Sequence, residues 1–585
     1  MTVSRRPALD RPWRRPGAAA YALARIRAVA APPVTVFDPE PGTVVADRDV
    51  AVTVRDGTVL RVNVYRPPAG GPCPVLLSAH PYGKDNLPRR RGRRSRLPVQ
   101  YRLMNQTAPV AHSTLTSWEA PDPAWWVAQG YAVVNADLRG AGTSDGVGSL
   151  LSDLEGQDVY DLVEWAAAQP WSTGSVGMLG VSYLAISQYK AAALAPPHLK
   201  AICPWEGFTD AYRDLMTPGG VQEDGFASIW TNRVKRSVRL SVDLAAGRAA
   251  HPQRDGWWQA LVPDLAKITV PMLVCTSFSD NNCHTRGSFR AFEQAGSAER
   301  HAYTHRAGKW ATFYGDEARA TQLAFFDRHL RGAESAPLPR VRLEVRESRD
   351  RVVAVRDEEG WPLPRTRWRP LHLAADGALT EAEPQSAGSI SFHTRRRAAA
   401  FTYTTDEDLE LTGPMAVRLW VEVGGGTDVH LFVGVEKWRG TRWFGFEGAY
   451  GYGRDRVATG WQAVSLRELD SSASTEAEPV HTFTHPQPLT PGEIVAVDVA
   501  LGPSATLFRA GDSIRLVVAG RWLAPRNPLT GQFPARYRGS PAATCTLHWG
   551  PQRPARLLVP DVPAGGPDPL CLQSRHDRPD RAGGR

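Results

Sequence analysis

Between residues 45 and 335, short apolar runs alternate with stretches of helical periodicity. Continuous apolar runs of this length are typical of strands buried on both faces of a sheet. They are PVLLSA at 74–79, YAVVNAD at 131–137, SVGMLGV at 175–181, LKAIC at 199–203 and VPMLVCTS at 270–277. Between them, Val159, Leu162, Val163 and Ala166 recur at helical spacing and form one apolar stripe. This alternation predicts a mostly parallel sheet with right-handed helical crossovers.

The pattern changes twice further along the chain. Residues 208–266 are helical in character and contain no buried strand run, which predicts a helical cap inserted over the carboxyl edge of the sheet. After about residue 332, strand-like segments are separated by turn signals such as Gly424-Gly425-Gly426. No long helix pattern lies between them, so this part is predicted to be an all-β sandwich.

These patterns divide the chain into five predicted parts. They are an N-terminal arm (1–44), an α/β domain (45–207 and 267–335), a helical cap (208–266), a β-sandwich of jelly-roll-like type (336–562) and a disordered tail (563–585). The arm is Arg-rich, and Arg25 and Arg27 interrupt its most apolar stretch, which argues against a secretory signal. We therefore expect a cytoplasmic protein with a mobile arm or a surface helix at its N-terminus.

Composition and charge narrow the function. The 585 residues are 42% hydrophobic and carry a net charge of +9, and no apolar run reaches the roughly 18–20 residues of a membrane span. The arginine-rich stretch RRRGRRSR at 89–96 lacks interleaved aromatic residues, so we interpret it as a solvated loop rather than a nucleic-acid site. Six scattered cysteines form no CxxC pair. Neither metal nor cofactor is expected, and neither nucleic acid nor membrane is an expected partner.

Ser182 lies between a predicted strand and a predicted helix, in the sequence GMLGVSYLA at 177–185. A serine on such a strand-to-helix turn is typical of the nucleophile of an α/β-hydrolase, which also needs a histidine, a carboxylate and oxyanion donors. Gly180 precedes Ser182 by two residues, but Leu184 stands where the usual G-x-S-x-G pattern has its second glycine. By itself, a G-x-S match is too short to identify a nucleophile.

Several spaced motifs resemble the cocaine esterase and Xaa-Pro dipeptidyl-peptidase family of hydrolases. The motifs are HPYGK at 80–84, DLRGAGTSDG at 137–146, the segment WSTGSVGMLGVSY at 171–183, FFDRHLRG at 325–332, and ALGPSATLFRAGDSIRLVVAG at 500–520 followed by NPLTG. Together they span roughly residues 45–562. The resemblance implies an α/β-hydrolase domain with an inserted helical cap, followed by a β-sandwich.

The resemblance also implies the roles of five residues. Ser182 matches the nucleophile, and Tyr82 matches a tyrosine whose hydroxyl forms the oxyanion hole with the backbone N–H after the serine, here that of Tyr183. A phenol is a neutral, rigid donor suited to that task. Asp280, directly after the run at 270–277, matches the orienting carboxylate, and His305 matches the general base.

Other histidines compete for the role of the base. The competitors are His301 and His284. We favour His305 because it follows a short apolar strand and comes 25 positions after Asp280.

The substrate is less well defined by the sequence. We expect a small-molecule ester, an amide or a short peptide, and favour an ester or amide with an uncharged acyl group over an Xaa-Pro dipeptide. A dipeptidase would need a desolvated carboxylate for the substrate ammonium. Candidate substrate-binding residues are Glu206, Asp210, Glu223, Asp224, Trp118, Trp125 and Trp126. A non-catalytic binding protein on a hydrolase scaffold is the alternative from another class, and the sequence is also compatible with a homodimer.

Overall fold

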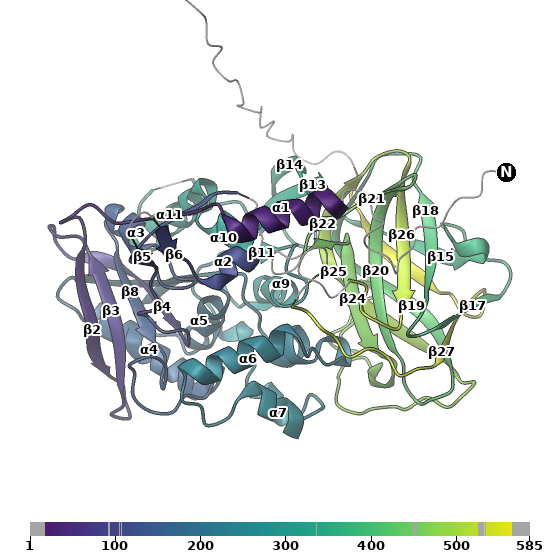
Figure 1. Cartoon of the computed structure of the whole chain (residues 1–585), viewed down its shortest axis with the longest axis horizontal. Helices are drawn as coiled ribbons and strands as arrows, with labels where there is room; N and C mark the ends of the chain where they lie inside the picture. Colours follow the sequence, from purple (N-terminus) through teal and green to yellow (C-terminus); the bar gives the residue numbers. More distant parts are fainter. Residues whose placement is uncertain are drawn as a thin grey trace, which may run out of the picture.

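The computed structural model describes residues 18–91, 94–104, 106, 108–334, 336–448, 453–524, 532 and 534–563. Two bodies lie side by side along the longest axis of the molecule (Figure 1). One is an α/β body that contains the helices α3 to α11, and the other consists of the strands β15 to β28. The FFDRHLRG segment forms the end of helix α11 (Asp316–Arg331), and two more strands of the α/β body follow it before the second body begins.

The α/β body is built on one twisted sheet. Its strand order is β2-β3-β8-β4-β9-β10-β11-β12-β13-β14. All neighbours from β8 to β13 are parallel, while the pairs β2–β3, β3–β8 and β13–β14 are antiparallel. The strands are β2 (Val45–Thr53), β3 (Val59–Arg66), β4 (Cys73–His80), β8 (Ala132–Asp137), β9 (Ser172–Val181), β10 (Leu199–Trp205), β11 (Met272–Ser277), β12 (Arg300–His305), β13 (Val341–Ser348) and β14 (Arg351–Glu358).

The central strands are buried along most of their length, as their continuous apolar runs predicted. Every residue of β4, β8 and β11 is buried. Helices α3 (Pro123–Ala128), α4 (Asp153–Ala167), α5 (Tyr183–Ala193), α9 (Thr285–Gln294) and α11 pack on the sheet. The apolar stripe of α4 is buried, and Ser152 caps the start of this helix by accepting a hydrogen bond from Glu155 N. The predicted parallel sheet with helical crossovers is therefore confirmed.

The segment after β10 contains helices and short helical turns, and no extended strand among its described residues. Its helices are α6 (Phe226–Ser237), α7 (Leu244–Ala250) and α8 (Gly256–Gln259). Helix α6 buries Ala227, Trp230 and Val234, so one side of it faces the body of the protein. This is the arrangement expected of a cap over the carboxyl edge of the sheet.

The second body is a β-sandwich around its own apolar core. One layer joins β16, β15, β28, β19 and β25, and the other joins β18, β26, β20 and β24. The bounds are β15 (Arg367–Ala374), β16 (Ala378–Thr380), β17 (Gly388–His393), β18 (Ala398–Thr404), β19 (Leu409–Gly424), β20 (His430–Arg439), β21 (Arg442–Phe444), β22 (Phe446–Glu447), β23 (Arg454–Asp455), β24 (Ala458–Ala463), β25 (Ile494–Phe508), β26 (Asp512–Ala519), β27 (Thr544–Trp549) and β28 (Arg556–Asp561).

The two bodies are tied together through buried polar contacts. The guanidinium of Arg306, just after β12, donates from Nη1 to Ser504 Oγ at 3.0 Å and from Nη2 to Val457 O at 3.1 Å. Arg286 on α9 donates to Ala500 O at 2.8 Å. The segments that follow β11 and β12 are therefore held by the sandwich as well as by the sheet.

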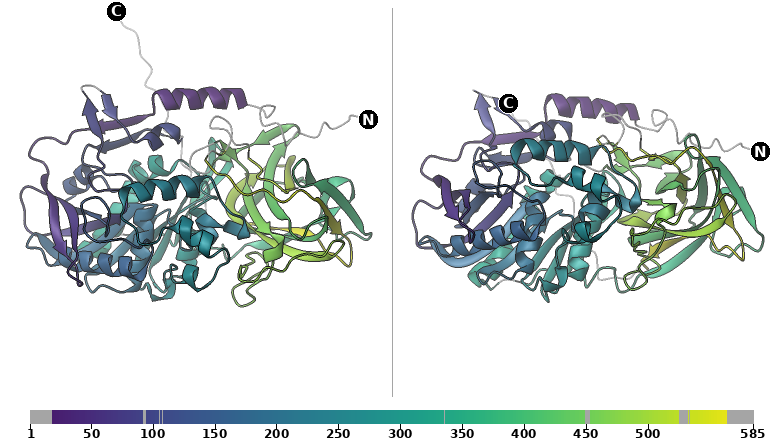
Figure 2. Two further views of the ribbon diagram at one scale, coloured as in Figure 1. Left: turned by 60° about the horizontal axis from the view of Figure 1, so that its bottom comes forward. Right: turned by 90° about the horizontal axis from the view of Figure 1, so that it is seen from below.

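The N-terminal arm contains an ordered helix, α1 (Ala18–Ala30), and a strand, β1 (Val34–Phe37). The strand pairs with β7 (Val110–Ser113), and α1 lies on the outside of the molecule near the boundary between the two bodies (Figures 1 and 2). We expected either a mobile arm or a surface helix in this segment, and residues 18–30 form a surface helix.

The arginine-rich stretch differs from its prediction. Instead of an irregular loop it forms a short hairpin of β5 (Arg89–Arg91) and β6 (Arg94–Arg96), followed by the short helix α2 (Val99–Leu103). Backbone pairing between the two strands satisfies main-chain groups that a loop would leave to water. The predicted disordered tail beyond residue 563 and the NPLTG motif lie outside the described residues. In the part of the chain that is described, no helix is long and apolar enough to cross a membrane.

Candidate active site

Ser182 occupies a strained turn between β9 and α5. Its backbone has φ 61° and ψ −115°, a region that non-glycine residues rarely adopt. The turn is tight, because a Cβ built on Gly180 would lie 2.4 Å from Leu184 Cβ. Glycine is therefore needed two residues before the serine, because the side chain of Leu184 occupies the space that a Cβ at position 180 would take. The side chain of Ser182 lines a cavity of about 210 Å³ beneath the cap.

A chain of hydrogen bonds leads from Ser182 to a histidine and a carboxylate. Ser182 Oγ lies 3.1 Å from His284 Nε2, and His284 Nδ1 lies 2.5 Å from Asp280 Oδ2. His284 and Asp280 are buried, and the ring of Phe208 stacks on the imidazole with centroids 6.2 Å apart. This is the geometry in which an imidazole can take a serine proton while a carboxylate fixes its orientation.

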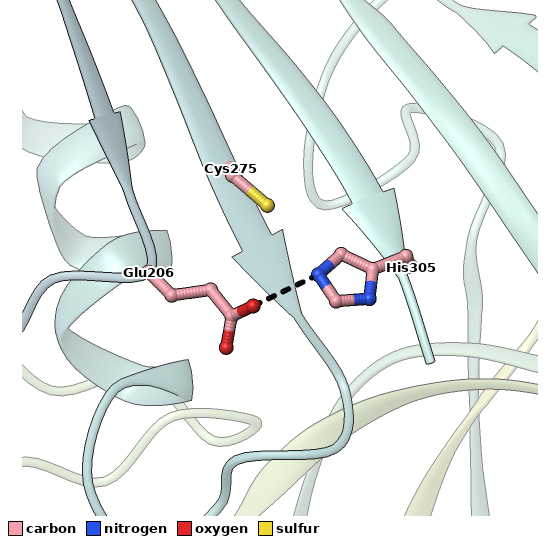
Figure 3. Close-up of side chains that lie close together, drawn as sticks. All are labelled: Glu206, Cys275 and His305. Atoms are coloured by element: carbon pink, nitrogen blue, oxygen red, sulfur yellow. Dashed lines mark hydrogen bonds and ion pairs between the residues drawn. The ribbon is translucent and has the colours of Figure 1, made fainter. Parts of the chain in front are cut away.

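His305 does not occupy that position. Its Nε2 lies 3.0 Å from Glu206 Oε1, and its Nδ1 accepts a hydrogen bond from Ala307 N at 3.2 Å. Both ring nitrogens thus have partners other than Ser182, and the expectation that His305 contacts the serine is corrected in favour of His284. The physical reason is a competing carboxylate. Glu206 follows strand β10, which is separated from β12 by β11, and its side chain engages His305 (Figure 3).

A short turn at the end of β11 brings Asp280 and His284 together. The backbone N–H groups of Cys283 and His284 both donate to Asp280 O, at 3.2 and 3.1 Å. The sandwich supports this turn, since Asn282 Nδ2 donates to Gln532 Oε1 at 3.3 Å. A turn of this kind places residues i and i+4 on one side, so the D-x-x-x-H spacing is the sequence signal that would have identified His284.

Lys309 adds a buried positive charge beside this pair. Its Nζ donates to Asp280 Oδ2 at 2.8 Å, and it lies 2.9 Å from His284 Nδ1 and 3.7 Å from Glu206 Oε2. Burial tends to raise the pKa of Asp280, but the charges of Lys309 and His284 outweigh it and hold this pKa below its usual value. Burial and the charge of Lys309 both lower the pKa of His284. The carboxylate is therefore ionised and the imidazole neutral at pH 7.

Tyr82 lies after β4 and faces the same cavity as Ser182. Trp230 Nε1, from cap helix α6, donates to its hydroxyl oxygen at 3.1 Å. Burial raises the pKa of Tyr82, while its hydrogen bonds with Trp230 and Ser182 lower it by less. The phenol is therefore neutral, and because its oxygen accepts from Trp230, its proton is available to an acceptor near Ser182.

The three predicted tryptophans lie in different surroundings. Trp118 lines the cavity and contacts the ring of Trp310, with centroids 4.8 Å apart. Trp126 packs against Phe326, and the guanidinium of Arg319 lies over the ring of Trp125. Trp125 and Trp126 are thus packing residues of α3 and not part of the cavity, because the side of this short helix that carries them faces helix α11 and its neighbours.

The predicted carboxylates also separate into two groups. Glu206 lines the cavity, where it is paired with His305 and Lys309. Asp210 is buried away from it and accepts from Arg254 Nε at 2.9 Å. The remaining two are also engaged elsewhere, Glu223 with backbone N–H groups at the start of α6 and Asp224 with Arg248.

Sequence reasoning missed another carboxyl group, that of Glu119. This residue is buried at the cavity wall, with a backbone φ of 65°, and its Oε2 has no hydrogen-bond partner among the described residues. Burial raises its pKa to about 8, although the charge of Lys309 opposes the shift. Glu119 is therefore mainly protonated and neutral at pH 7. No sequence motif marks it, because the loop between β7 and α3 has no recognisable periodicity.

Comparison with known proteins places the chain in a family. The family model described as X-Pro dipeptidyl-peptidase (S15 family) matches residues 56–311, and the one described as X-Pro dipeptidyl-peptidase C-terminal non-catalytic domain matches residues 334–558. A solved CocE/NonD family hydrolase from Staphylococcus aureus is 34% identical, with a TM-score of 0.84 over 89% of this chain and 94% of that chain. The chain belongs to the CocE/NonD hydrolase family.

Two further proteins are similar to this chain, one in sequence and one in fold. Cocaine esterase of Rhodococcus sp. (strain MB1 Bresler) is 26% identical and matches 88% of this chain and 98% of its own length. The structure of an α-amino acid ester hydrolase, 18% identical with a TM-score of 0.66, shares the fold. The predicted fold class, an α/β-hydrolase body followed by a β-rich body, is confirmed. This CocE/NonD chain is a serine hydrolase, and the reading of it as a non-catalytic binding protein is not supported.

One cluster in this hydrolase has residue types that can hold a metal ion. Ligand atoms of Glu206, Cys275 and His305 lie within 4.8 Å of one another (Figure 3). Three features oppose a cation there. Glu206 and His305 bond to each other, burial raises the pKa of the Cys275 thiol so that it stays protonated, and the ammonium of Lys309 lies 3.7 Å from Glu206 Oε2. The cluster is better described as a buried, hydrogen-bonded Glu206–His305 pair close to Asp280 and His284.

Proposed function

We propose that this chain hydrolyses an ester or amide through an acyl-enzyme on Ser182, with His284 as the general base and Asp280 as the carboxylate that orients it. The observation that carries the proposal is the continuous path from Ser182 Oγ to His284 Nε2 and from His284 Nδ1 to Asp280 Oδ2. The path opens into a cavity under the cap, at the carboxyl edge of a parallel sheet where α/β enzymes bind their ligands.

In the first step, Ser182 Oγ attacks the carbonyl carbon and His284 Nε2 takes the hydroxyl proton. Asp280 stabilises the imidazolium that forms, and Lys309 keeps Asp280 ionised. The imidazolium then gives the proton to the leaving alcohol or amine. In the second half, water attacks the acyl carbon while His284 Nε2 accepts a proton from it. His284 then returns this proton to Ser182 Oγ as the bond between Oγ and the acyl carbon breaks and the acid leaves.

The oxyanion formed in each half needs hydrogen-bond donors. We assign them to the Tyr82 hydroxyl and to the backbone N–H of Tyr183, the first residue of α5. The helix start contributes favourable partial positive charge to this point. Trp230 supports the assignment, since its bond to the Tyr82 oxygen directs the phenolic proton away from itself.

The acyl group we favour is uncharged and apolar. The cavity wall is formed mostly by apolar side chains from α2, α6 and the catalytic body, among them Leu103, Met104, Trp118, Ile186, Leu215, Phe226 and Trp230. The carboxylates that could have bound a substrate ammonium are engaged with other groups, and Glu119 is neutral at pH 7. An ammonium in this cavity would therefore lack an ionised partner.

Xaa-Pro dipeptidyl-peptidase activity is the second candidate, because the family model that matches residues 56–311 carries that description. In this case Glu119 is the carboxyl group available to the substrate ammonium. Its pKa of about 8 implies that ammonium binding is strongest near pH 8, since Glu119 is mainly neutral below that pH and the substrate amine loses its proton above it. A cytoplasmic location and a homodimer stay predictions from the sequence.

A labelling experiment combined with a substrate panel tests the proposal. A fluorophosphonate probe is expected to modify Ser182 in the wild-type protein and to leave Ser182→Ala unlabelled, and that variant should lose on the order of 10⁶ in kcat. Uncharged aryl and alkyl esters should be cleaved at pH 7 in preference to Xaa-Pro anilides. Absence of labelling, or label on another residue, would contradict the proposal, and a preference for Xaa-Pro anilides would select the second candidate.

A further inference from the structure

Lys309 holds a position that the proposed reaction does not explain by itself. It is the first residue of α10 (Lys309–Phe313), and its side chain is 13% exposed. A serine, a histidine and a carboxylate suffice for the proton transfers described above. Its ammonium lies 2.9 Å from the ring nitrogen of His284, and removing a charge from water costs free energy. A functional role would explain why the charge is kept at this position.

We propose that Lys309 is a positioning residue of the catalytic pair, which holds Asp280 Oδ2 in place and sets the lowest pH at which His284 can accept the Ser182 proton. The inference rests on the proposed roles of Ser182 and His284 and adds a device that determines when they act. It assigns Lys309 no contact with the substrate and no part in the proton transfer itself.

The geometry gives two consequences. Lys309 Nζ and His284 Nδ1 converge on the same oxygen of Asp280, at 2.8 and 2.5 Å, so the carboxylate cannot rotate without losing both bonds. The ammonium also lies on the Nδ1 side of the ring, where it opposes a second positive charge on the imidazole. His284 therefore loses its resting proton at a lower pH than it would without Lys309, and it is ready to act as a base in mildly acidic solution.

The other groups around His284 act in the opposite direction. Glu206 and Asp280 favour a protonated imidazole, whereas Glu119 lies near Lys309 but is mainly neutral at pH 7. The thiol of Cys283, whose Sγ lies 3.5 Å from His284 Nε2, stays neutral because burial raises its pKa. The phenol of Tyr82 faces the same cavity, His305 is bonded to Glu206, and Asp214 and Glu223 act on Cys283 from further away. Removing Lys309 would leave Asp280 and Glu206 without the positive charge that opposes them. Both effects of its removal would raise the pKa of His284.

The test is the pH dependence of kcat/KM for an uncharged ester. In Lys309→Met, the acidic limb is expected to move to higher pH by about one unit or more, the size of shift that a neighbouring charge produces. Lys309→Arg keeps the charge, because arginine stays protonated, and should leave the limb close to that of the wild type. Lys309→Gln keeps a hydrogen-bond donor for Asp280 but no charge, and should shift like Lys309→Met.

A matched control comes from another buried lysine. Lys190 donates to Asp153 Oδ1 at 2.7 Å, and Lys190→Met should leave the limb unchanged. The rate of fluorophosphonate labelling at each pH gives the same limb for any variant that folds. An acidic limb that stays in place in Lys309→Met or Lys309→Gln would overturn this inference. Wild-type protein that the probe does not label at Ser182 would instead overturn the proposed function.

Discussion

Replacing Tyr82 by phenylalanine separates catalysis from packing in the candidate active site. The change deletes one hydroxyl and keeps a ring that is 8% exposed and lies edge-on to the ring of Tyr183. If the hydroxyl donates to the oxyanion, its loss should lower kcat by about 10²–10³-fold, the effect of one missing oxyanion donor. KM should change little, because this bond is made mainly in the transition state.

The structure adds a stability term to this prediction. Trp230 Nε1 donates to the deleted oxygen, so Tyr82→Phe leaves a mostly buried indole N–H without its acceptor. We expect a loss of up to about 1–3 kcal/mol in the free energy of unfolding, smaller if water from the cavity replaces the oxygen. The sequence alone could not show this effect, because nothing in it identifies Trp230 as the partner of Tyr82.

The assay measures kcat, KM and the melting temperature on the same preparations. Tyr189→Phe is the matched control: Tyr189 is buried on α5, and its hydroxyl has no hydrogen-bond partner within the described part of the chain. That control should retain wild-type kcat. A Tyr82→Phe enzyme with near-wild-type kcat would refute the oxyanion assignment, whatever its melting temperature.

Two further predictions concern residues that only the structure identifies. Trp230→Phe should lower kcat by about three- to tenfold although Tyr82 is still present. Without the hydrogen bond from Trp230, the phenol hydroxyl can rotate and its proton is no longer directed towards the substrate. An unchanged kcat would mean that the cap does not orient Tyr82. Glu119 has a pKa raised from 4.5 to about 8, so its folded form binds the proton more tightly and the associated stability is lost as the pH rises towards 8. Glu119→Gln should therefore gain in melting temperature relative to the wild type between pH 5 and pH 8.5, and a difference independent of pH would contradict this assignment.

The fold could be predicted well from the sequence, because buried strands and helices have recognisable patterns of apolar residues. The mostly apolar runs of β4 and β11 are typical of strands covered on both faces, and the stripe of α4 is typical of the buried side of a helix. The position of Ser182 was predictable for a related reason, since a glycine two residues earlier is required by the close approach of Leu184.

The candidate site was predictable only in part, because its partners are set by contacts between distant segments. His284 follows strand β11 and His305 is the last residue of β12, and the choice between them depends on Glu206, which follows β10 and engages His305. The contribution of Lys309 likewise depends on the path of the chain after β12. Trp125 and Trp126 were misassigned because an aromatic residue in a loop sequence looks the same whether it lines a cavity or packs against a helix.

The central claim, that His284 activates Ser182, is tested most directly by fluorophosphonate labelling of two matched variants. His284→Gln removes the base beside Ser182 Oγ, while His305→Gln can keep a hydrogen bond to Glu206. The labelling rate at Ser182 should fall by about 10³-fold or more in His284→Gln, because an unactivated serine is a weak nucleophile. In His305→Gln it should stay within about tenfold of the wild type. Rapid labelling of His284→Gln together with loss of labelling in His305→Gln would contradict the account and return the role of base to His305.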